Sequence, residues 1–139
     1  MPKKINSPRK KLTRQELRNL DLEILFLEGV VRRDPVYVDA LQILADNYTR
    51  RGRFDEGLKM DESLSRLRPK DAIVHYNLAC SYSLTNQIEQ AFEALHAAIE
   101  LGYRDFNSLD KDPDLENLRQ HAEYKRIRAK IRGLQTKAT

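Results

Sequence analysis

The sequence predicts an all-α protein, an array of helical hairpins of the α-solenoid kind. The first observation is an internal repeat, because a segment in the middle of the chain recurs after 34 residues. The second is the composition: five Gly and five Pro among 139 residues, with 40% apolar and 33% charged residues, suit a helical globular protein. The matched pairs of the repeat include Leu44 and Leu78, Ala45 and Ala79, Tyr48 and Tyr82, Gly57 and Ala91, Leu58 and Phe92, and Leu67 and Leu101.

The residue types inside the repeat explain why its unit is a hairpin. Small residues such as Ala45, Gly57 and Ala91 are expected where two helices approach closely, while Tyr48 and Tyr82 fill the space around them. This pattern resembles the tetratricopeptide repeat, and the resemblance implies two antiparallel helices per unit. The similarity is to the bacterial type, in which a capping unit follows the repeats.

Three residues depart from the family's pattern. Asp61 stands where a bulky apolar residue is usual, His75 where Leu or Trp is common, and Tyr103 where Pro would close the second unit. Pro69 does close the first unit, because proline cannot continue a helix interior. The departures concern local packing, and the predicted architecture does not depend on them.

The N-terminal part divides into an arm and a helix. Residues 1–12 are basic and lack periodicity, so we expect a disordered arm. Residues 13–34 form an N-terminal helix, since Thr13 and Glu16 have the spacing of a capping box and Pro35 ends the segment. This helix aligns with the second helix of each repeat, so it is an incomplete repeat.

The N-terminal helix has more apolar residues than one buried face requires. We therefore expect a second apolar face of this helix to be covered. If the same helix of another copy covers it, the protein forms a homodimer. Coverage by the basic arm and partial exposure remain open alternatives. The residues concerned are Leu22, Leu25 and Phe26.

The two complete repeats occupy residues 35–102. Gly52 and Asn86 lie at the turns inside the two hairpins, Asp71 is a helix N-cap, and Gly102 ends the last helix. The expected helices are 36–51, 54–68, 72–85 and 88–101.

The period fails after Gly102. Residues 103–133 predict short capping helices, in which Asp112 and Pro113 start one helical turn and 121–133 forms the last helix. These residues resemble the closing unit of bacterial tetratricopeptide proteins, which implies that they cap the open end of the stack. Residues 134–139 are expected to be a disordered tail.

Catalytic and metal-binding patterns are missing from the sequence. His75, His96 and His121 fall on separate predicted helices, Cys80 is the one cysteine, and no HExxH, CxxC or glycine-rich phosphate loop is present. We expect no enzyme activity, no metal and no cofactor. The sequence lacks an apolar run of about eighteen residues that would predict a membrane span, and no signal peptide is recognisable. The single cysteine suits a reducing, cytoplasmic location.

The resemblance also implies where a partner would bind. In tetratricopeptide proteins the first helices of successive repeats line a concave groove that holds a peptide or a partner helix. Tyr76, with Ile73 and Leu84, is expected to supply apolar contact there. The groove positions in the first repeat are Asp39, Gln42, Asp46, Thr49 and Arg50. Those in the second are Ile73, Tyr76, Asn77, Cys80, Ser83 and Leu84, and the cap adds Asn107, Asp110 and Lys111.

The net charge of +4 is unevenly distributed. Residues 1–14 hold six basic and no acidic side chains, residues 120–139 hold six basic and one acidic, and the middle holds 13 basic and 20 acidic. The basic ends leave open a nucleic-acid- or ribosome-associated function through phosphate contacts, a solubilising role, and docking of an arm on the acidic middle. The favoured function is protein–protein interaction, as a non-catalytic adaptor or scaffold.

Overall fold

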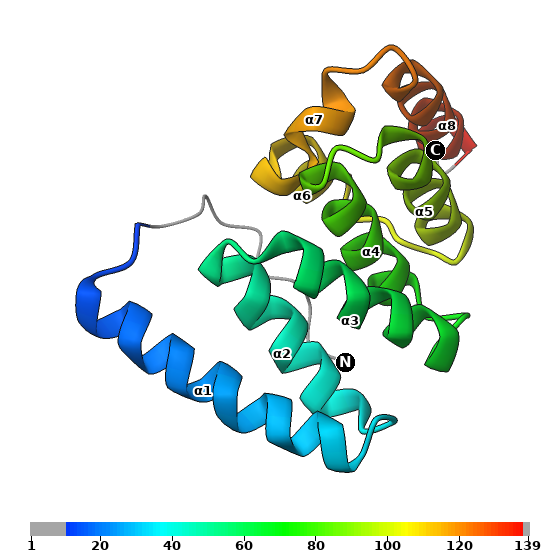
Figure 1. Ribbon diagram of the computed structural model, residues 1–139. Helices are drawn as coiled ribbons and strands as arrows, with labels where there is room; N and C mark the ends of the chain where they lie inside the picture. Colours follow the sequence, from blue (N-terminus) through cyan, green and yellow to red (C-terminus); the bar gives the residue numbers. More distant parts are fainter. Residues whose placement is uncertain (1–10, 138–139) are drawn as a thin grey trace.

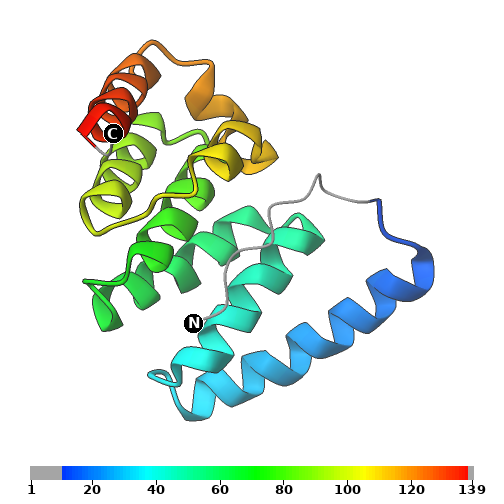
Figure 2. The same cartoon turned by 180° about the vertical axis from the view of Figure 1, so that it is seen from behind.

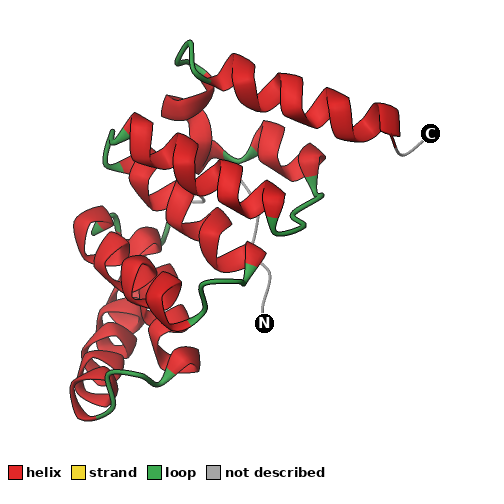
Figure 3. Ribbon diagram, turned by 90° about the vertical axis from the view of Figure 1, so that its right-hand side faces the viewer, coloured by secondary structure: helices red, strands yellow, loops and turns green. Residues whose placement is uncertain are grey.

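The computed structural model describes residues 11–137, and this part of the chain is entirely helical. Eight α-helices and one short 3₁₀ helix are joined by short loops, with no β-strand among the described residues (Figure 3). No helix within 11–137 combines the length and the apolar character that crossing a membrane requires. The elements are α1 (Arg14–Arg33), α2 (Val38–Arg51), α3 (Phe54–Leu67), α4 (Ala72–Leu84), α5 (Ile88–Glu100), α6 (Phe106–Lys111), η1 (Pro113–Leu115), α7 (Glu116–Arg119) and α8 (Tyr124–Lys137).

Helices α1 to α5 stack in chain order, η1 and α7 then pack back against α4, and α8 lies beside α5 (Figure 1 and Figure 2). α2 pairs with α3 and α4 pairs with α5, which gives the two predicted hairpins, while α1 packs on α2 and α3 packs on α4. The all-α prediction is confirmed. The largest core lies between α4, α5 and the C-terminal segment, and smaller clusters join α1 to α2 and α2 to α3 and α4.

Local sequence signals set the helix ends. The side chain of Thr13 accepts a hydrogen bond from the amide of Glu16, and the Glu16 carboxylate accepts one from the Thr13 amide, so the predicted capping box is present. Gly52 ends α2 with φ of 85°, the left-handed conformation that other residues avoid. Asp71 caps α4 by accepting from the amides of Ile73 and Val74.

Contacts between helices recur with the period of the sequence. The Tyr48 hydroxyl donates to Glu28 of α1 at 2.5 Å, and the Tyr82 hydroxyl donates to Glu62 of α3 at 3.0 Å. Both members of the second pair lie 34 residues after those of the first. This hydrogen bond therefore joins α1 to α2 in the same way as α3 to α4.

A small residue and a buried polar residue inside the hairpins are both explained by helix packing. A Cβ atom on Gly57 would lie 3.1 Å from Oγ1 of Thr49, so the glycine permits the close approach of α2 and α3. Asp61, which departs from the family's apolar pattern, is buried and accepts a hydrogen bond from the Ser81 hydroxyl at 2.5 Å. This pairing compensates for the burial of a carboxylate.

The last helix differs from the prediction at both ends. It begins at Tyr124 instead of residue 121 and continues to Lys137 instead of residue 133. No proline interrupts it, Leu134 packs against the main core, and the Thr136 hydroxyl donates to the carbonyl of Arg132. The predicted disordered tail is therefore wrong for residues 134–137, and residues 138–139 lie outside the described residues. The predicted basic arm, residues 1–12, also lies largely outside them.

Gly29, in the interior of α1, provides a test of helix stability. A Cβ atom there would meet nothing within 4 Å. Replacing it by alanine should raise the free energy of unfolding by about 0.5–1 kcal/mol, because alanine loses less conformational entropy in a helix. Urea denaturation followed by circular dichroism measures this. Gly52→Ala is the matched comparison and should lower stability, since its φ is positive. A Gly29→Ala variant no more stable than the parent would contradict the helical account of Gly29.

Candidate protein-interaction surface

The α4 part of the predicted groove is closed. Tyr76 is 1% exposed, and Cys80 and Ser83 are fully buried, because η1 and α7 pack against α4. The Tyr76 hydroxyl donates to Oδ2 of Asp112 at 2.7 Å, and its ring stacks on Tyr103 with the centroids 4.3 Å apart. The prediction that these three residues line an open groove is corrected: they belong to the core beneath the C-terminal cap.

The other predicted groove residues stay at least partly accessible. On α4, the residues Ile73, Asn77 and Leu84 are half-buried. On α2, Asp39, Asp46 and Arg50 are exposed, and Gln42 and Thr49 are half-buried; in the cap, Asn107, Asp110 and Lys111 are exposed. The sequence analysis missed Ile43, which is 46% exposed and one helical turn from Asp39 and Asp46. The accessible face of α2 is thus polar around one apolar residue.

α1 exposes the three apolar residues that were predicted to form a second face. Leu22, Leu25 and Phe26 are 61%, 67% and 70% exposed. Successive helix residues are about 100° apart, so Leu22 and Phe26 point away from Ile24, which is buried against α2. We call these three exposed residues the outer face of α1.

The equivalent helices of the two hairpins carry polar residues at two of these positions. Leu22 corresponds to Glu56 in α3 and Gln90 in α5 after one and two periods. Leu25 corresponds in the same way to Lys59 and Glu93. Lys59, Gln90 and Glu93 are exposed and Glu56 is half-buried. Hairpin packing therefore does not require leucine at either position of α1.

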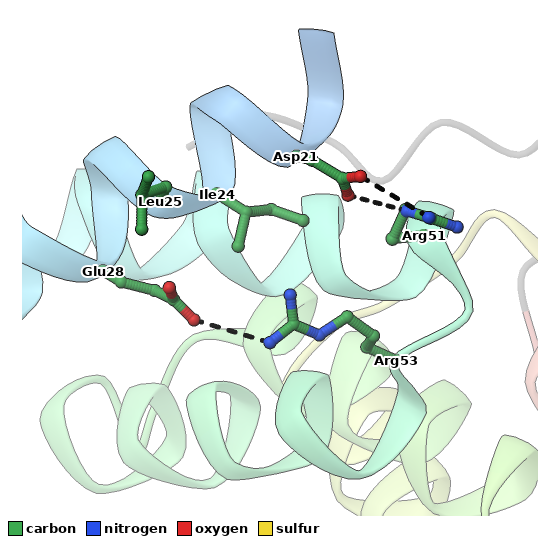
Figure 4. A pocket seen from close by; sticks show the side chains of 6 residues that line it. All are labelled: Asp21, Ile24, Leu25, Glu28, Arg51 and Arg53. Atoms are coloured by element: carbon green, nitrogen blue, oxygen red, sulfur yellow. Dashed lines mark hydrogen bonds and ion pairs between the residues drawn. The ribbon is translucent and has the colours of Figure 1, made fainter. Parts of the chain in front are cut away.

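A shallow cleft lies beside the outer face. It has a volume of about 520 Å³ and opens between α1, the end of α2 and the start of α3 (Figure 4). Leu25 belongs both to the cleft and to the outer face, so the two form one continuous surface. The cleft is lined by Asp21, Ile24, Leu25, Glu28, Arg51 and Arg53.

Ion pairs across the cleft hold α1 to the first hairpin. Nε of Arg51 lies 2.7 Å from Oδ1 of Asp21, and a guanidinium nitrogen of Arg53 lies 3.6 Å from Oε2 of Glu28. Arg53 also bonds Glu56 at 2.6 Å, and this hydrogen bond lowers the pKa of the Glu56 carboxyl. The acidic side chains of α1 are therefore directed toward α2 and α3.

The metal-ligating side chains of the described residues do not come together. No group of three or more His, Cys, Asp or Glu side chains within 11–137 is placed to hold a metal ion. Nε2 of His75 donates to the carbonyl of Pro69 at 2.7 Å, and Nδ1 of His121 accepts from the amide of Glu123. His96 lies beside the Phe92 ring. His75 and His96 lie on the separate helices α4 and α5 as predicted, whereas His121 lies in the turn before α8 and not on a helix.

Part of the basic charge near the C-terminus is used inside the molecule. Arg126 pairs with Glu123, and its guanidinium lies over the ring of Phe92. Lys130 pairs with Glu100, whose carboxyl has a lowered pKa because of this hydrogen bond. These contacts give α8 a packing role, and nucleic-acid binding by the basic ends stays a prediction.

Comparison with known proteins gives a partial match. No family model matches the chain. Over 80 residues the chain is 38% identical to a chloroplastic protein of Arabidopsis thaliana, a match that covers 55% of this chain and 24% of that protein. The chain thus matches about a quarter of this relative's length.

Proposed function

We propose that the chain is a tetratricopeptide-type helical repeat protein that binds another protein, as a non-catalytic adaptor or scaffold. The 34-residue period supports the class, as do the close approach at Gly57 and the recurring hydrogen bonds of Tyr48 and Tyr82. Arrays of stacked hairpins present extended surfaces to partners. A reducing compartment such as the cytoplasm belongs to the proposal, because the single cysteine, Cys80, is a buried free thiol.

The observation that carries the proposal is the outer face of α1. Leu22, Leu25 and Phe26 are each more than half exposed, although leucine or phenylalanine of this size contributes about 1.5–3 kcal/mol when buried. Clustered exposed apolar residues are typical of contact sites. Since α3 and α5 have polar residues at the positions of both leucines, a partner that covers α1 explains their presence best.

Site-specific photo-crosslinking tests this proposal. A photoreactive residue at position 25 should crosslink a partner protein in cells, whereas the same residue at position 93 should not, because Glu93 is the equivalent exposed position of α5. The double substitution Leu22→Glu/Phe26→Glu should abolish the crosslink from position 25. The same photoreactive residue at position 43 tests whether the polar face of α2 also contacts a partner. Equal crosslinking from positions 25 and 93 would refute a specific site on α1.

A further inference from the structure

We infer that the partner of the outer face is an acidic amphipathic helix of another protein. This inference rests on the proposed function and adds the chemistry of the partner. The inference depends on the distribution of charge around α1 and on the positions of its arginines relative to the apolar patch. It also depends on the charge and apolar area of the other candidate occupants.

Basic side chains surround the outer face. Arg14 and Arg18 precede Leu22 at successive four-residue steps, which places them on the same side of α1. Arg32 and Arg33 follow Phe26 by six and seven residues, at the other end of the same side. All four arginines are exposed. We call them the basic rim.

The acidic residues of α1 do not neutralise this rim. Asp21 bonds Arg51, Glu23 accepts from the Asn47 amide at 3.0 Å, and Glu28 accepts from the Tyr48 hydroxyl. These three contacts direct the carboxylates of Asp21, Glu23 and Glu28 toward the first hairpin. The fourth acid of α1, Glu16, accepts from the Thr13 amide at the start of the helix. The helix thus separates most of its charges: the first three acids face the rest of the molecule, and bases border the apolar patch. A partner with carboxylates around an apolar strip complements this arrangement.

A second copy of the chain complements it only in part. A parallel pair would align each arginine with itself and bring like charges together. An antiparallel pair with its two-fold axis at Ile24, midway between Leu22 and Phe26, would pair Arg14 with Asp34 and Arg32 with Glu16. It would leave Arg18 and Arg33 opposite the uncharged Val30 and Gln15. The three apolar side chains also fall well short of the roughly 800 Å² per partner of a standard interface. The predicted homodimer through Leu22, Leu25 and Phe26 is therefore the less favoured occupant.

The basic arm and a membrane surface are disfavoured for electrostatic reasons. Residues 1–10 contain four basic and no acidic side chains, so the rim would repel them. An anionic membrane would attract the rim but repel the acidic middle of the chain, residues 15–119, which holds 20 acidic and 13 basic residues. A single acidic helix meets only α1. It therefore gains the attraction without this repulsion.

The partner's sequence can be stated as a pattern. A helix with Leu, Ile or Phe at i, i+3, i+4 and i+7 would cover the patch, and Glu or Asp at both flanks would pair with the rim. Four exposed ion pairs together favour an acidic over a basic partner by about tenfold, and salt weakens this preference.

Synthetic peptides test the inference on the full chain. Three fluorescent peptides are compared by anisotropy: an acidic amphipathic helix, the same helix with Lys for every Glu, and a scrambled acidic sequence. We expect the acidic helix to bind about tenfold tighter than the lysine helix, and salt to weaken it. Arg14→Glu/Arg18→Glu should weaken this binding about fivefold; carboxylates are favourable near a helix N-terminus, so α1 stays folded. Lys125→Glu/Arg132→Glu makes the same charge change on exposed residues of α8 and should have little effect.

The other outcomes separate the two proposals. If the lysine helix binds equally well and depends on Leu25, the inference fails while protein binding by α1 stands. Binding of the scrambled peptide equal to that of the amphipathic helix would also overturn the inference. Dimerisation in sedimentation equilibrium that Leu25→Glu abolishes would overturn it as well. The same holds if the protein binds vesicles of phosphatidylcholine and phosphatidylglycerol but none of the peptides. If no peptide binds and position 25 gives no crosslink in cells, both the inference and the proposed function fail.

Discussion

Replacing Tyr76 by alanine should lower the free energy of unfolding by about 3–5 kcal/mol, the range for removing a large aromatic side chain from a core. The side chain is 1% exposed, stacks on Tyr103 and donates a hydrogen bond to Asp112. Its loss leaves a cavity between α4 and the cap, and it removes one partner of a buried carboxylate. Chemical denaturation measures the change.

Two variants make this test specific. Tyr76→Phe keeps the ring and removes the hydroxyl, so it should cost about 1–2 kcal/mol. Tyr37→Ala removes a tyrosine that is 47% exposed and should change stability by about 0.5 kcal/mol or less. A cost below about 1 kcal/mol for Tyr76→Ala would contradict its core position and return it to the predicted groove.

The helices of the hairpins were predictable because their signals are local. Thr13 and Glu16 mark the start of α1, Gly52 marks the end of α2, and the observed bounds of α1 to α5 lie within two residues of the predicted ones. The second apolar face of α1 was visible for the same reason, since helical periodicity shows any stripe wider than one packing surface requires. Part of its basic rim is also visible in the sequence, since Arg14 and Arg18 precede Leu22 at four-residue steps.

The burial of the α4 face could not be found in this way. Tyr76 aligns with Gln42 of the first repeat, which is half-buried, so the period suggested an accessible position. The chain after α6 turns at Asp112 and Pro113, and η1 and α7 then pack against α4. The hydrogen bond between Tyr76 and Asp112 spans 36 residues. Contacts between residues so far apart in the sequence cannot be predicted from local periodicity.

Alkaline solution should unfold the protein through two buried tyrosines. Burial, the largest cause, and then the charges of Cys80 and Asp112 raise the pKa of Tyr76 well above its usual value. Burial and Asp110 likewise raise the pKa of Tyr124, which is also 1% exposed. In the unfolded chain both hydroxyls ionise near pH 10. The stabilisation is therefore complete below about pH 10 and is lost as the pH rises, because the unfolded state releases its protons first.

Each such tyrosine removes about 1.4 kcal/mol of stability per pH unit above pH 10, so the pair removes about 2–3 kcal/mol per unit. Denaturation at a series of pH values measures this slope, and Tyr76→Phe isolates one contribution. The variant is expected to be the less stable protein at neutral pH, since it lacks the hydrogen bond to Asp112. Its stability should fall less steeply in alkali, so the two curves should cross near pH 11. Parallel curves would show that the Tyr76 hydroxyl ionises as readily in the folded protein as in the unfolded chain, which its burial under the cap does not allow.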